Sequence, residues 1–578
     1  MTVNDLNWKI GGAAGEGIMN AGLVFAKCCM RAGLYTFSYS EYPSLIRGGH
    51  NTVDVRVRNT QLYSHTKNVN VLVALNKEAV DKHKDKISEN GGIIYDGEIA
   101  PTATGEVRAD VKLFNVPLKK LAEEAGSKIF MNTVAIGASL ALVDIKIDHL
   151  YNILTEIFKR KGEAVVEDNK KAAKSGYEYI QDNYHEEFVH KLKEQEHKDN
   201  ILISGNEAIV AGAIKAGCKF MSSYPMTPAT SIMVNMVKNE YEYGIVMKHT
   251  EDELAAMNMA IGAAYTGVRA MAATSGGGFA LMCEALGMAS QNETPVVGIL
   301  CQRAGCATGM ATKTSQEDLH FALNSSPAEG PRLVLAPGDV DEFFYNTFDT
   351  FNLAEKYQLP SIIITDKFIA QASNSVKEFD TQNMKIDRGK LMRDKDCEME
   401  TDYKRYKLTE DAISPRATPG QPKCMHVASS YEHDEYGTEN EESKNKIDMT
   451  HKRNKKLASL AEDLPMPQIY GKENAEFTLV GWGSMKGIVL EALMLLEKEN
   501  INVNYIHFIY LNPLKKEIKE LLEEQKNLIL IENNSWGQLG RVIRQETGIE
   551  MKNKLLKYDG RQFFPEEIAD GIKQMLKK

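Results

Sequence analysis

Residues 218–240 read CKFMSSYPMTPATSIMVNMVKNE: an apolar strand pattern, a loop with two prolines, and a helix pattern. Proline cannot continue a central strand, and it favours extended backbone in the residue before it. The stretch therefore predicts a strand that ends in a rigid loop, residues 224–228, followed by a helix. The same order repeats downstream, and such alternation is typical of an α/β fold with a parallel sheet.

Three more strand patterns follow this first one, each leading into a helix or loop: GIVMKHT (244–250), RAMAATS (269–275) and PVVGILCQ (295–302). Strand–helix alternation also occurs near both ends of the chain, whereas the stretch before the last hundred residues is highly charged and has little apolar pattern. The fold class predicted is α/β with three doubly wound domains. Their predicted bounds are 1–190, 196–385 and 475–578, with a connector at 386–474.

Composition limits the classes of function. The 578 residues carry a formal net charge of −10 and a pI near 5.8, which argues against nucleic acid as the main partner. No apolar run reaches the roughly 18 residues that a membrane span needs, and MTVNDLNWKI lacks the features of a signal peptide. The eight cysteines form no iron–sulfur or zinc spacing, so no metal site is predicted on this chain. A reducing cytoplasm is the expected setting.

Ligands of open parallel sheets bind at the carboxyl ends of the strands. In the second domain these ends carry a threonine in the proline loop (Thr227), a carboxylate (Glu253), a glycine turn and an arginine (Arg303), with Thr308 five residues further. Each alone has an ordinary structural explanation, such as a helix-terminal charge or a surface ion pair. Together on one edge they favour a functional site.

Glu253 is the most informative of these residues. The helix that it begins, LAAMNMAIGAAY, is apolar nearly all round and is predicted to be buried, which would desolvate the carboxylate. The neighbouring acids Glu251 and Asp252 fit helix capping better. A buried acid that shares a proton suits a hydrogen bond to a ring nitrogen, and Arg303 suits bidentate binding of a substrate carboxylate.

The first domain opens with a strand, a glycine turn that contains Gly15 and Gly17, and a helix. Such a turn can bind phosphate on backbone N–H groups, but it can equally be a tight turn without a ligand. The dinucleotide-binding pattern G-x-G-x-x-G is not matched. A basic glycine loop beginning at Arg47 has a surface turn as its simplest interpretation.

These motifs together resemble the alpha subunit of 2-oxoacid:ferredoxin oxidoreductases, in the form with a gamma domain fused at the N-terminus. SSYPMTPAT (222–230) resembles the Tyr-Pro-Ile-Thr-Pro loop of that family. The stretches from Glu251 to Phe279 and from Gln302 to Leu319 resemble its thiamine-side helix and its arginine loop. GGAAGEGI and SEYPSLIRGGHNT resemble the gamma domain, although the family's usual turn is G-x-G-G-x-G, and NNSWGQLGR resembles the C-terminal domain, which is transketolase-like.

The resemblance implies a function: oxidative decarboxylation of a 2-oxoacid, with 2-oxoglutarate as the expected one, to acyl-CoA and CO2, with reduction of ferredoxin. The chain would work with a beta subunit in a dimer of heterodimers. Thiamine diphosphate would be shared between the subunits, coenzyme A would be a co-substrate, and Mg2+ and an iron–sulfur cluster would belong to the beta subunit. This division agrees with the lack of a G-D-G…N diphosphate motif here.

The resemblance also implies residue roles. Glu253 would activate the cofactor, with Tyr224, Pro225, Ser275 and Gly276 around it. Thr227, Arg303 and Thr308 would contact the substrate carboxylate, and Lys313 a second carboxylate, although an exposed loop lysine is an equally good interpretation. Gly15, Gly17 and Arg47 are candidate contacts to coenzyme A or a partner.

Two other classes stay open at this point. One is a transketolase-like or lipoamide-linked thiamine enzyme, which would lack the gamma-type first domain. The other is a non-catalytic, alpha-like scaffold.

Overall fold

The computed structural model describes residues 4–45, 48–100, 107–184, 187–196 and 198–577. Its described residues divide into two compact units. Unit 1 is Met1–Ser204, Gln371–Glu378 and Phe564–Asp570, and unit 2 is Gly205–Ala370, Phe379–Phe563 and Gly571–Lys578.

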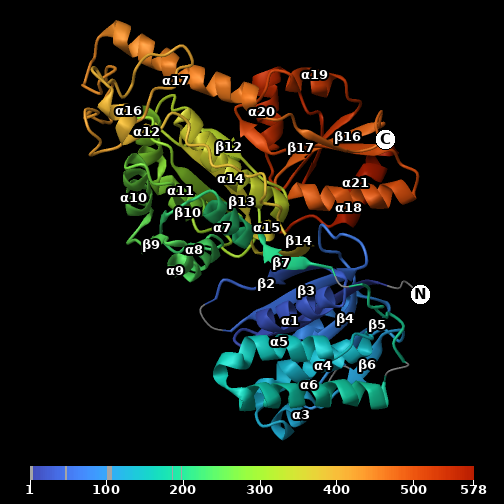
Figure 1. The fold of residues 1–578 in the computed structure, drawn as a ribbon. Helices are drawn as coiled ribbons and strands as arrows, with labels where there is room; N and C mark the ends of the chain where they lie inside the picture. Colours follow the sequence, from blue (N-terminus) through green and yellow to red (C-terminus); the bar gives the residue numbers. More distant parts are fainter. Residues whose placement is uncertain (1–3, 46–47, 101–106, 185–186, 197, 578) are drawn as a thin grey trace. The chain divides into compact units, whose positions relative to one another are not determined.

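Within the described residues, unit 1 holds an eight-stranded mixed sheet of order β6-β5-β4-β1-β3-β2-β14-β7 (Figure 1). The β6-β5-β4-β1 half is parallel, and the rest is antiparallel. The strands are β1 (Asp5–Ala13), β2 (Tyr35–Glu41), β3 (His50–Arg58), β4 (Val69–Ala74), β5 (Ile87–Tyr95), β6 (Lys112–Asn115), β7 (Asn200–Ser204) and β14 (Ser373–Lys377). The helices are α1 (Ile18–Arg31), α2 (Lys77–His83), α3 (Leu118–Glu124), α4 (Met131–Leu142), α5 (Asp148–Phe158) and α6 (Glu163–Asn183). β7 and β14, at the two ends of the segment predicted as the second domain, thus join the first sheet.

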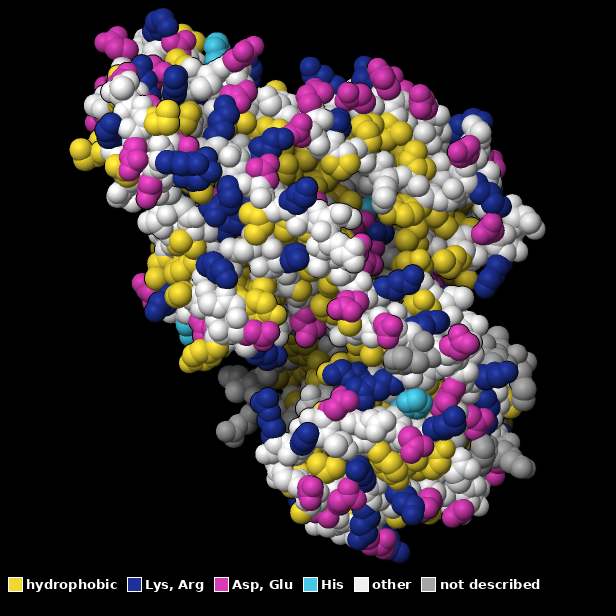
Figure 2. Space-filling view, viewed as in Figure 1, with side chains coloured by type: hydrophobic (Ala, Val, Ile, Leu, Met, Phe, Trp, Pro, Cys, Tyr) yellow, Lys and Arg dark blue, Asp and Glu magenta, His cyan; other side chains and the backbone are white. Residues whose placement is uncertain are grey.

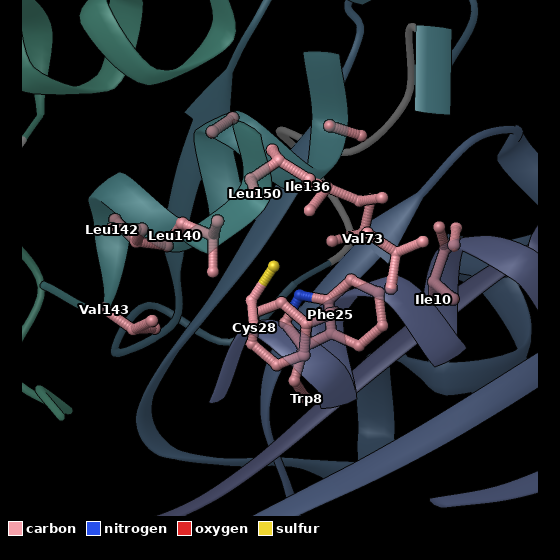
Figure 3. Packing of buried hydrophobic residues seen from close by; sticks show 14 of the residues in the cluster. Trp8, Ile10, Phe25, Cys28, Val73, Ile136, Leu140, Leu142, Val143 and Leu150 are labelled. Atoms are coloured by element: carbon pink, nitrogen blue, oxygen red, sulfur yellow. The ribbon is translucent and has the colours of Figure 1, made fainter. Parts of the chain in front are cut away.

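The core of unit 1 forms where the apolar side of α1 meets the sheet (Figure 3). Trp8 of β1 stacks on Phe25 of α1 with ring centroids 4.3 Å apart, and both side chains are buried. The indole N–H of Trp8 donates to Ser139 Oγ at 3.0 Å, so the one polar atom of this buried ring is satisfied. This packing fixes the middle of β1, the strand after which the glycine turn follows.

Unit 2 contains two sheets. Its first sheet has seven described strands in the order β18-β12-β13-β11-β10-β8-β9, all parallel except for the β12–β18 pair. The strands are β8 (Phe220–Ser223), β9 (Val246–His249), β10 (Ala270–Thr274), β11 (Val297–Gln302), β12 (Leu333–Leu335), β13 (Ser361–Asp366) and β18 (Tyr510–Asn512). The helices are α7 (Gly205–Lys215), α8 (Thr230–Lys238), α9 (Glu240–Tyr243), α10 (Glu253–Tyr265), α11 (Gly276–Leu281), α12 (Cys283–Gln291), α13 (Leu319–Leu323), α14 (Val340–Tyr357) and α15 (Lys367–Gln371).

The order of these strands contains a topological switch point. From β8 the chain moves to β9 on one side and then to β10 on the other side of β8. In open α/β sheets the crevice beyond the carboxyl ends of the strands at such a point is the ligand site. Here it lies between the loop after β8 and the loop after β10.

The second sheet of unit 2 has the described order β15-β17-β16-β19-β20, with β15 antiparallel to its neighbour. Its elements are β15 (Gln468–Gly471), β16 (Phe477–Trp482), α18 (Met485–Lys498), β17 (Val503–Phe508), α19 (Ile518–Glu523), β19 (Leu528–Glu532), α20 (Gln538–Thr547) and β20 (Asn553–Leu556). The last helix, α21 (Pro565–Leu576), is divided between the two units. Residues of both sheets share one apolar core cluster, including Val334 and Val480.

The predicted connector is ordered and well packed. It carries α16 (Asp394–Glu398) and the long α17 (Ser443–Asp463). Tyr406 and Lys456 in it are fully buried. Several of its charged side chains form ion pairs with two buried glutamates of the same unit, Glu355 of α14 and Glu293 after α12, and these pairs hold the connector in place.

Charged side chains of both signs are interspersed over the face shown in Figure 2. Across the described residues, no helix combines the length and apolar character that crossing a membrane requires.

Candidate active site

The proline loop after β8 is held in place by Asn206 of α7. This buried side chain donates to the carbonyl of Pro228 at 2.9 Å and to Ser231 Oγ at 2.7 Å. On the other side of the loop, Arg303 Nη1 donates to the carbonyl of Thr227 at 3.2 Å. The loop predicted to be rigid is thus held from two sides at its C-terminal end, and its Thr227 lies next to the arginine.

Glu253 is the first residue of α10 and is 3% exposed, which confirms the predicted burial of its carboxylate. Asp252 caps the helix, as predicted, by accepting a hydrogen bond from the N–H of Ala255 at 2.8 Å. Thr274 Oγ1, at the end of β10, donates to Glu253 Oε1 at 3.1 Å. A hydroxyl from the neighbouring strand end therefore orients the carboxylate.

The prediction that α10 is buried all round is wrong for this chain. Ala256, Met257 and Ala260 are buried, but Leu254 is 45% exposed and Met259 is 40% exposed. Apolar composition does not tell which face of a helix has a neighbour, and in the described chain only one face has one.

A glycine makes room for this carboxylate. A Cβ on Gly278 of α11 would lie 2.2 Å from Glu253 Oε1 and 2.1 Å from Thr274 Oγ1, so any side chain there would displace the pair. The glycine run after β10 therefore lets the helix backbone approach Glu253 directly.

Two buried donors at this edge have no partner in the described residues. Ser275, between β10 and α11, is fully buried, and its Oγ makes no hydrogen bond there. Arg303 follows β11 and is 9% exposed, and its Nε is likewise unpartnered. Buried donors without partners are rare in folded proteins, and at a sheet switch point they indicate a place for a ligand.

Arg303 lies in the field of two carboxylates. Burial lowers the pKa of its guanidinium, while Asp318 and, less strongly, Glu253 raise it. The arginine is thus the positive member of a small charged group at the switch point.

The arginine loop is anchored at its far end to the second sheet of unit 2. Gln316 donates to the carbonyl of Trp482 at 2.9 Å and accepts from the N–H of Asn533 at 3.0 Å. Thr314 Oγ1 donates to Asp366 Oδ1 at 3.0 Å, and Ser484 donates to the other oxygen of Asp366. The second sheet of unit 2 therefore helps to position the loop that carries Arg303.

The remaining predicted site residues differ in how exposed they are. Thr308 is exposed. The carbonyl oxygen of the preceding residue, Ala307, would lie 3.5 Å from a Cβ on Gly277, so this segment is close to the start of α11. Lys313 is partly exposed, with its Cβ near Gly560. Tyr224 is 39% exposed.

Two more of the predicted residues line the loops after β8 and β10. Pro225 is partly buried, and Gly276 begins α11, where a Cβ would lie 2.9 Å from Asp318 Oδ2.

In unit 1 the glycine turn between β1 and α1 is exposed. Gly15 and Gly17 both have positive φ, 92° and 75°, which explains why glycine stands there. The carboxylate of Glu16 accepts a hydrogen bond from the N–H of Ala13 at 2.7 Å, so one turn donor is used within the chain. Arg47 lies outside the described residues.

Sequence reasoning did not find Thr274 or Asp318 as site residues, and it included Gly278 in the glycine turn without giving it a contact to Glu253. Thr274 ends the strand before that turn, and Asp318 lies at the end of the arginine-loop stretch. Their positions at strand and loop ends were a signal, but their contacts to Glu253 and Gly276 join segments far apart in the sequence.

Known proteins are similar to this chain over nearly its whole length. Residues 211–452 match the family described as "Pyruvate flavodoxin/ferredoxin oxidoreductase, thiamine diP-bdg", residues 7–179 match "Pyruvate ferredoxin/flavodoxin oxidoreductase", and residues 469–548 match "Transketolase, C-terminal domain". The 2-oxoacid:ferredoxin oxidoreductase subunit alpha of Saccharolobus solfataricus is 33% identical, covering 99% of this chain and 98% of the relative. The chain belongs to the 2-oxoacid:ferredoxin oxidoreductase alpha-subunit family.

Two other members of this oxidoreductase family extend the comparison. The 2-oxoglutarate oxidoreductase subunit KorA of Mycobacterium tuberculosis is 26% identical over 98% of this chain and 91% of its own length. A solved structure, 2-oxoglutarate:ferredoxin oxidoreductase from Magnetococcus marinus with 2-oxoglutarate, coenzyme A and succinyl-CoA bound, is 34% identical, with a TM-score of 0.93 and 99% of both chains covered. The predicted family and the predicted α/β fold of three domain types are confirmed.

Proposed function

We propose that this alpha subunit binds the aminopyrimidine of thiamine diphosphate at the β8–β10 switch point and uses Glu253 to activate it for decarboxylation of a 2-oxoacid. The observation that carries the proposal is the buried Glu253 carboxylate, oriented by Thr274 beside buried donors that have no partner in the described residues. The match of residues 211–452 to a thiamine-binding family supports it.

The residues present fit such a group. An aminopyrimidine offers ring nitrogens that accept and an amine that donates, and the site supplies a carboxylate at Glu253 and a free hydroxyl at Ser275. The glycine run at the start of α11 leaves the approach to Glu253 without side chains. When bound, thiamine diphosphate supplies a carbanion and an electron sink. Tyr224, Pro225 and Gly276 line the same loops.

The role of Glu253 is to hold a proton between its carboxylate and a ring nitrogen. Burial keeps water away from this hydrogen bond, and Thr274 fixes the orientation of the carboxylate. Proton sharing by a positioned acid contributes about 10²–10⁴-fold to rate.

Arg303, Thr227 and Thr308 are the proposed contacts of the substrate's carboxylate. Arg303 keeps its Nε free of partners in the described residues, while Nη1 is fixed on the proline loop. An arginine held in this way can present its fork to a carboxylate. Holding the carboxylate in a fixed place next to the reacting carbon lowers the entropic part of the barrier.

The proposed substrate is 2-oxoglutarate. The support is the Magnetococcus marinus structure, which is similar over the full chain and holds 2-oxoglutarate and succinyl-CoA, and the name of the mycobacterial relative. Lys313, in the arginine loop, is proposed to meet the distal carboxylate. Lys313→Met should then raise the KM for 2-oxoglutarate but not for pyruvate, whereas Lys238→Met, at an exposed position at the end of α8, should change neither.

The remaining parts of the assembly are proposed from the family. A beta subunit would carry Mg2+ and an iron–sulfur cluster, ferredoxin would accept electrons, and coenzyme A would take the acyl group and contact the Gly15–Gly17 turn and Arg47 of the gamma-type domain. A dimer of heterodimers in the cytoplasm is the expected form.

The test is coexpression with the neighbouring beta-subunit gene, followed by a 2-oxoacid panel with viologen dye and coenzyme A. We expect an iron-containing, active complex, and an iron-free, inactive alpha chain when it is purified alone. Stoichiometric iron in the single chain would contradict the division of cofactors. A stable complex that turns over no oxoacid would favour a scaffold.

A further inference from the structure

Asp318 is a second carboxylate at the site, and the proposed function does not use it. It lies at the end of the arginine loop, just before α13. Its backbone N–H donates to Gln302 Oε1 at 2.8 Å, and Gln302 is the last residue of β11, next to Arg303. The backbone of Asp318 is therefore tied to the strand that delivers the arginine.

The side chain of Asp318 lies against the start of α11. A Cβ on Gly276 would lie 2.9 Å from Asp318 Oδ2, so the carboxylate touches the backbone beside Ser275. Ser275 Oγ is buried and has no partner in the described residues. Asp318 thus borders the space next to the unpartnered Ser275 hydroxyl, and its backbone is bonded to Gln302, the residue before Arg303.

The charges that act on Asp318 come from two elements. Burial, and less strongly the charge of Glu317 on the same loop, raise the pKa of its carboxyl to about 6, while Arg303 after β11 opposes this shift. Arg303 is in turn influenced by Glu253 of α10. No hydrogen bond to the Asp318 carboxylate occurs within the described residues, so Arg303 is the group that favours its ionised form.

A substrate carboxylate bound to Arg303 would bring a second anion to the one cation that offsets Asp318. Two carboxylates that share a site cannot both stay ionised at low cost, and one of them takes a proton. The bound oxoacid is a strong acid, so the proton would go to Asp318.

Resting on the proposed function, we propose that Asp318 balances Arg303 in the free enzyme and takes up one proton from solvent when the carboxylate of the 2-oxoacid binds Arg303. The step forms one O–H bond on Asp318, and the proton comes from the buffer. Asp318 is then a positioning residue that makes substrate binding proton-linked and disfavours it at alkaline pH.

The experiment uses the complex with the beta subunit. KM and kcat for 2-oxoglutarate are measured from pH 5.5 to 8.5 in the wild type and in Asp318→Asn. Above about pH 6 the wild-type KM should rise, by up to about tenfold per pH unit. In Asp318→Asn the KM should be nearly independent of pH, with kcat less affected. A KM that is raised equally at all pH values in the variant would overturn the proposal, because that is the result of a merely structural role.

Proton uptake gives a second, direct readout. Calorimetry with N-oxalylglycine, an unreactive 2-oxoglutarate isostere, in two buffers of different ionisation enthalpy should show uptake of close to one proton at pH 7 in the wild type and none in Asp318→Asn. Equal uptake in both proteins would overturn the inference.

A second variant tests the same proposal if Asp318→Asn does not fold. In Glu317→Gln the neighbouring charge is lost, so the pH at which KM begins to rise should move lower, while the amide oxygen can still accept from the N–H of Gly305. An unmoved profile would count against the proposal. Failure of the proposed function looks different: no oxoacid is turned over, or Arg303→Lys leaves every KM unchanged.

Discussion

Two buried glutamates in unit 2 are surrounded in opposite ways. Glu293, after α12, is fully buried, and Lys452 donates to its Oε2 at 2.6 Å. Lys456 donates to the same oxygen, and Arg405 donates to the backbone carbonyl at 2.9 Å. Burial opposes the charge of Glu293, but the two lysines hold the pKa of its carboxyl well below the usual range.

Glu253 is almost as buried and has far fewer partners. Thr274 donates to one of its oxygens, and the nearby Ser275 hydroxyl and Arg303 Nε have no partner in the described residues. A buried charge that is fully paired within the chain has no hydrogen-bonding capacity left for a ligand, whereas one with open neighbours can still bind something else. The number of internal partners, and not burial, separates the structural glutamate from the proposed catalytic one.

The largest effect should come from Glu253→Gln. Glutamine has nearly the same volume but cannot share a titratable proton, so turnover of the complex should fall by about 10²–10⁴-fold with the thermal unfolding midpoint nearly unchanged. The measurements are viologen reduction and hydrogen–deuterium exchange at the thiazolium C2. Glu251→Gln, on the exposed side of the same turn, is the matched control. Wild-type exchange in the Glu253 variant, or its loss in the Glu251 variant, would give the role to Glu251.

Glu293→Gln should lower stability and leave activity nearly unchanged, which is the reverse of the result expected for Glu253→Gln. It leaves the buried Lys452 and Lys456 without a counter-charge, and breaking a buried ion pair costs about 3–5 kcal/mol of unfolding free energy. Urea titration measures that loss, and the rate per folded complex should stay close to wild type. Glu441→Gln, an exposed acid of the same connector, should change neither quantity. A stable but inactive Glu293 variant would break the distinction between the two glutamates.

Arg303→Lys tests the role of the cation at the proposed site. Lysine keeps the charge but loses the fork, so one charge-assisted hydrogen bond to the substrate is lost. The expected cost of about 1.5–3 kcal/mol is a roughly ten- to hundredfold fall in kcat/KM, mainly through KM. An unchanged kcat/KM for every accepted oxoacid would remove Arg303 from the site.

The parts of this arrangement that sequence could predict are local. Apolar runs such as 269–275 and 295–302 gave the buried strands β10 and β11, and Asp252 was recognised as a cap because its bond reaches only three residues along the chain. The strand ends then gave Glu253 and Arg303. The antiparallel pairing of β14 with β2 was not predictable in this way, because it joins residues more than 300 positions apart.

The same limit explains what was missed at the site and in the connector. The contacts of Asp318 with Gly276, and of Gly278 with Glu253, depend on how separate loops meet. The Lys452 and Lys456 charges looked like a solvated run, because only the fold brings Glu293 between them. Composition gives the charges, but tertiary structure decides which are paired.

The smallest expected effect concerns stability, and it extends the comparison to Asp318. For a carboxyl whose pKa is raised on folding, here to about 6, the folded state favours the protonated form. Its ionisation therefore begins to reduce stability as pH rises above the ordinary value near 3.8, and the full cost is present above about pH 6. The pH dependence of the Glu293 contribution is opposite in sign: its stabilisation is present above its ordinary pKa and is lost as pH falls.

Asp318→Asn should thus be more stable than the wild type at pH 7.5, with the difference disappearing by pH 4, whereas Glu293→Gln should be closest to the wild type in acid. The measurement is the thermal unfolding midpoint of the two variants across this range, with Glu441→Gln as the control. An Asp318 variant that is less stable than the wild type at pH 7.5 would mean that its carboxylate is paired like that of Glu293, and the contrast between an open site and a closed ion cluster would not extend to it.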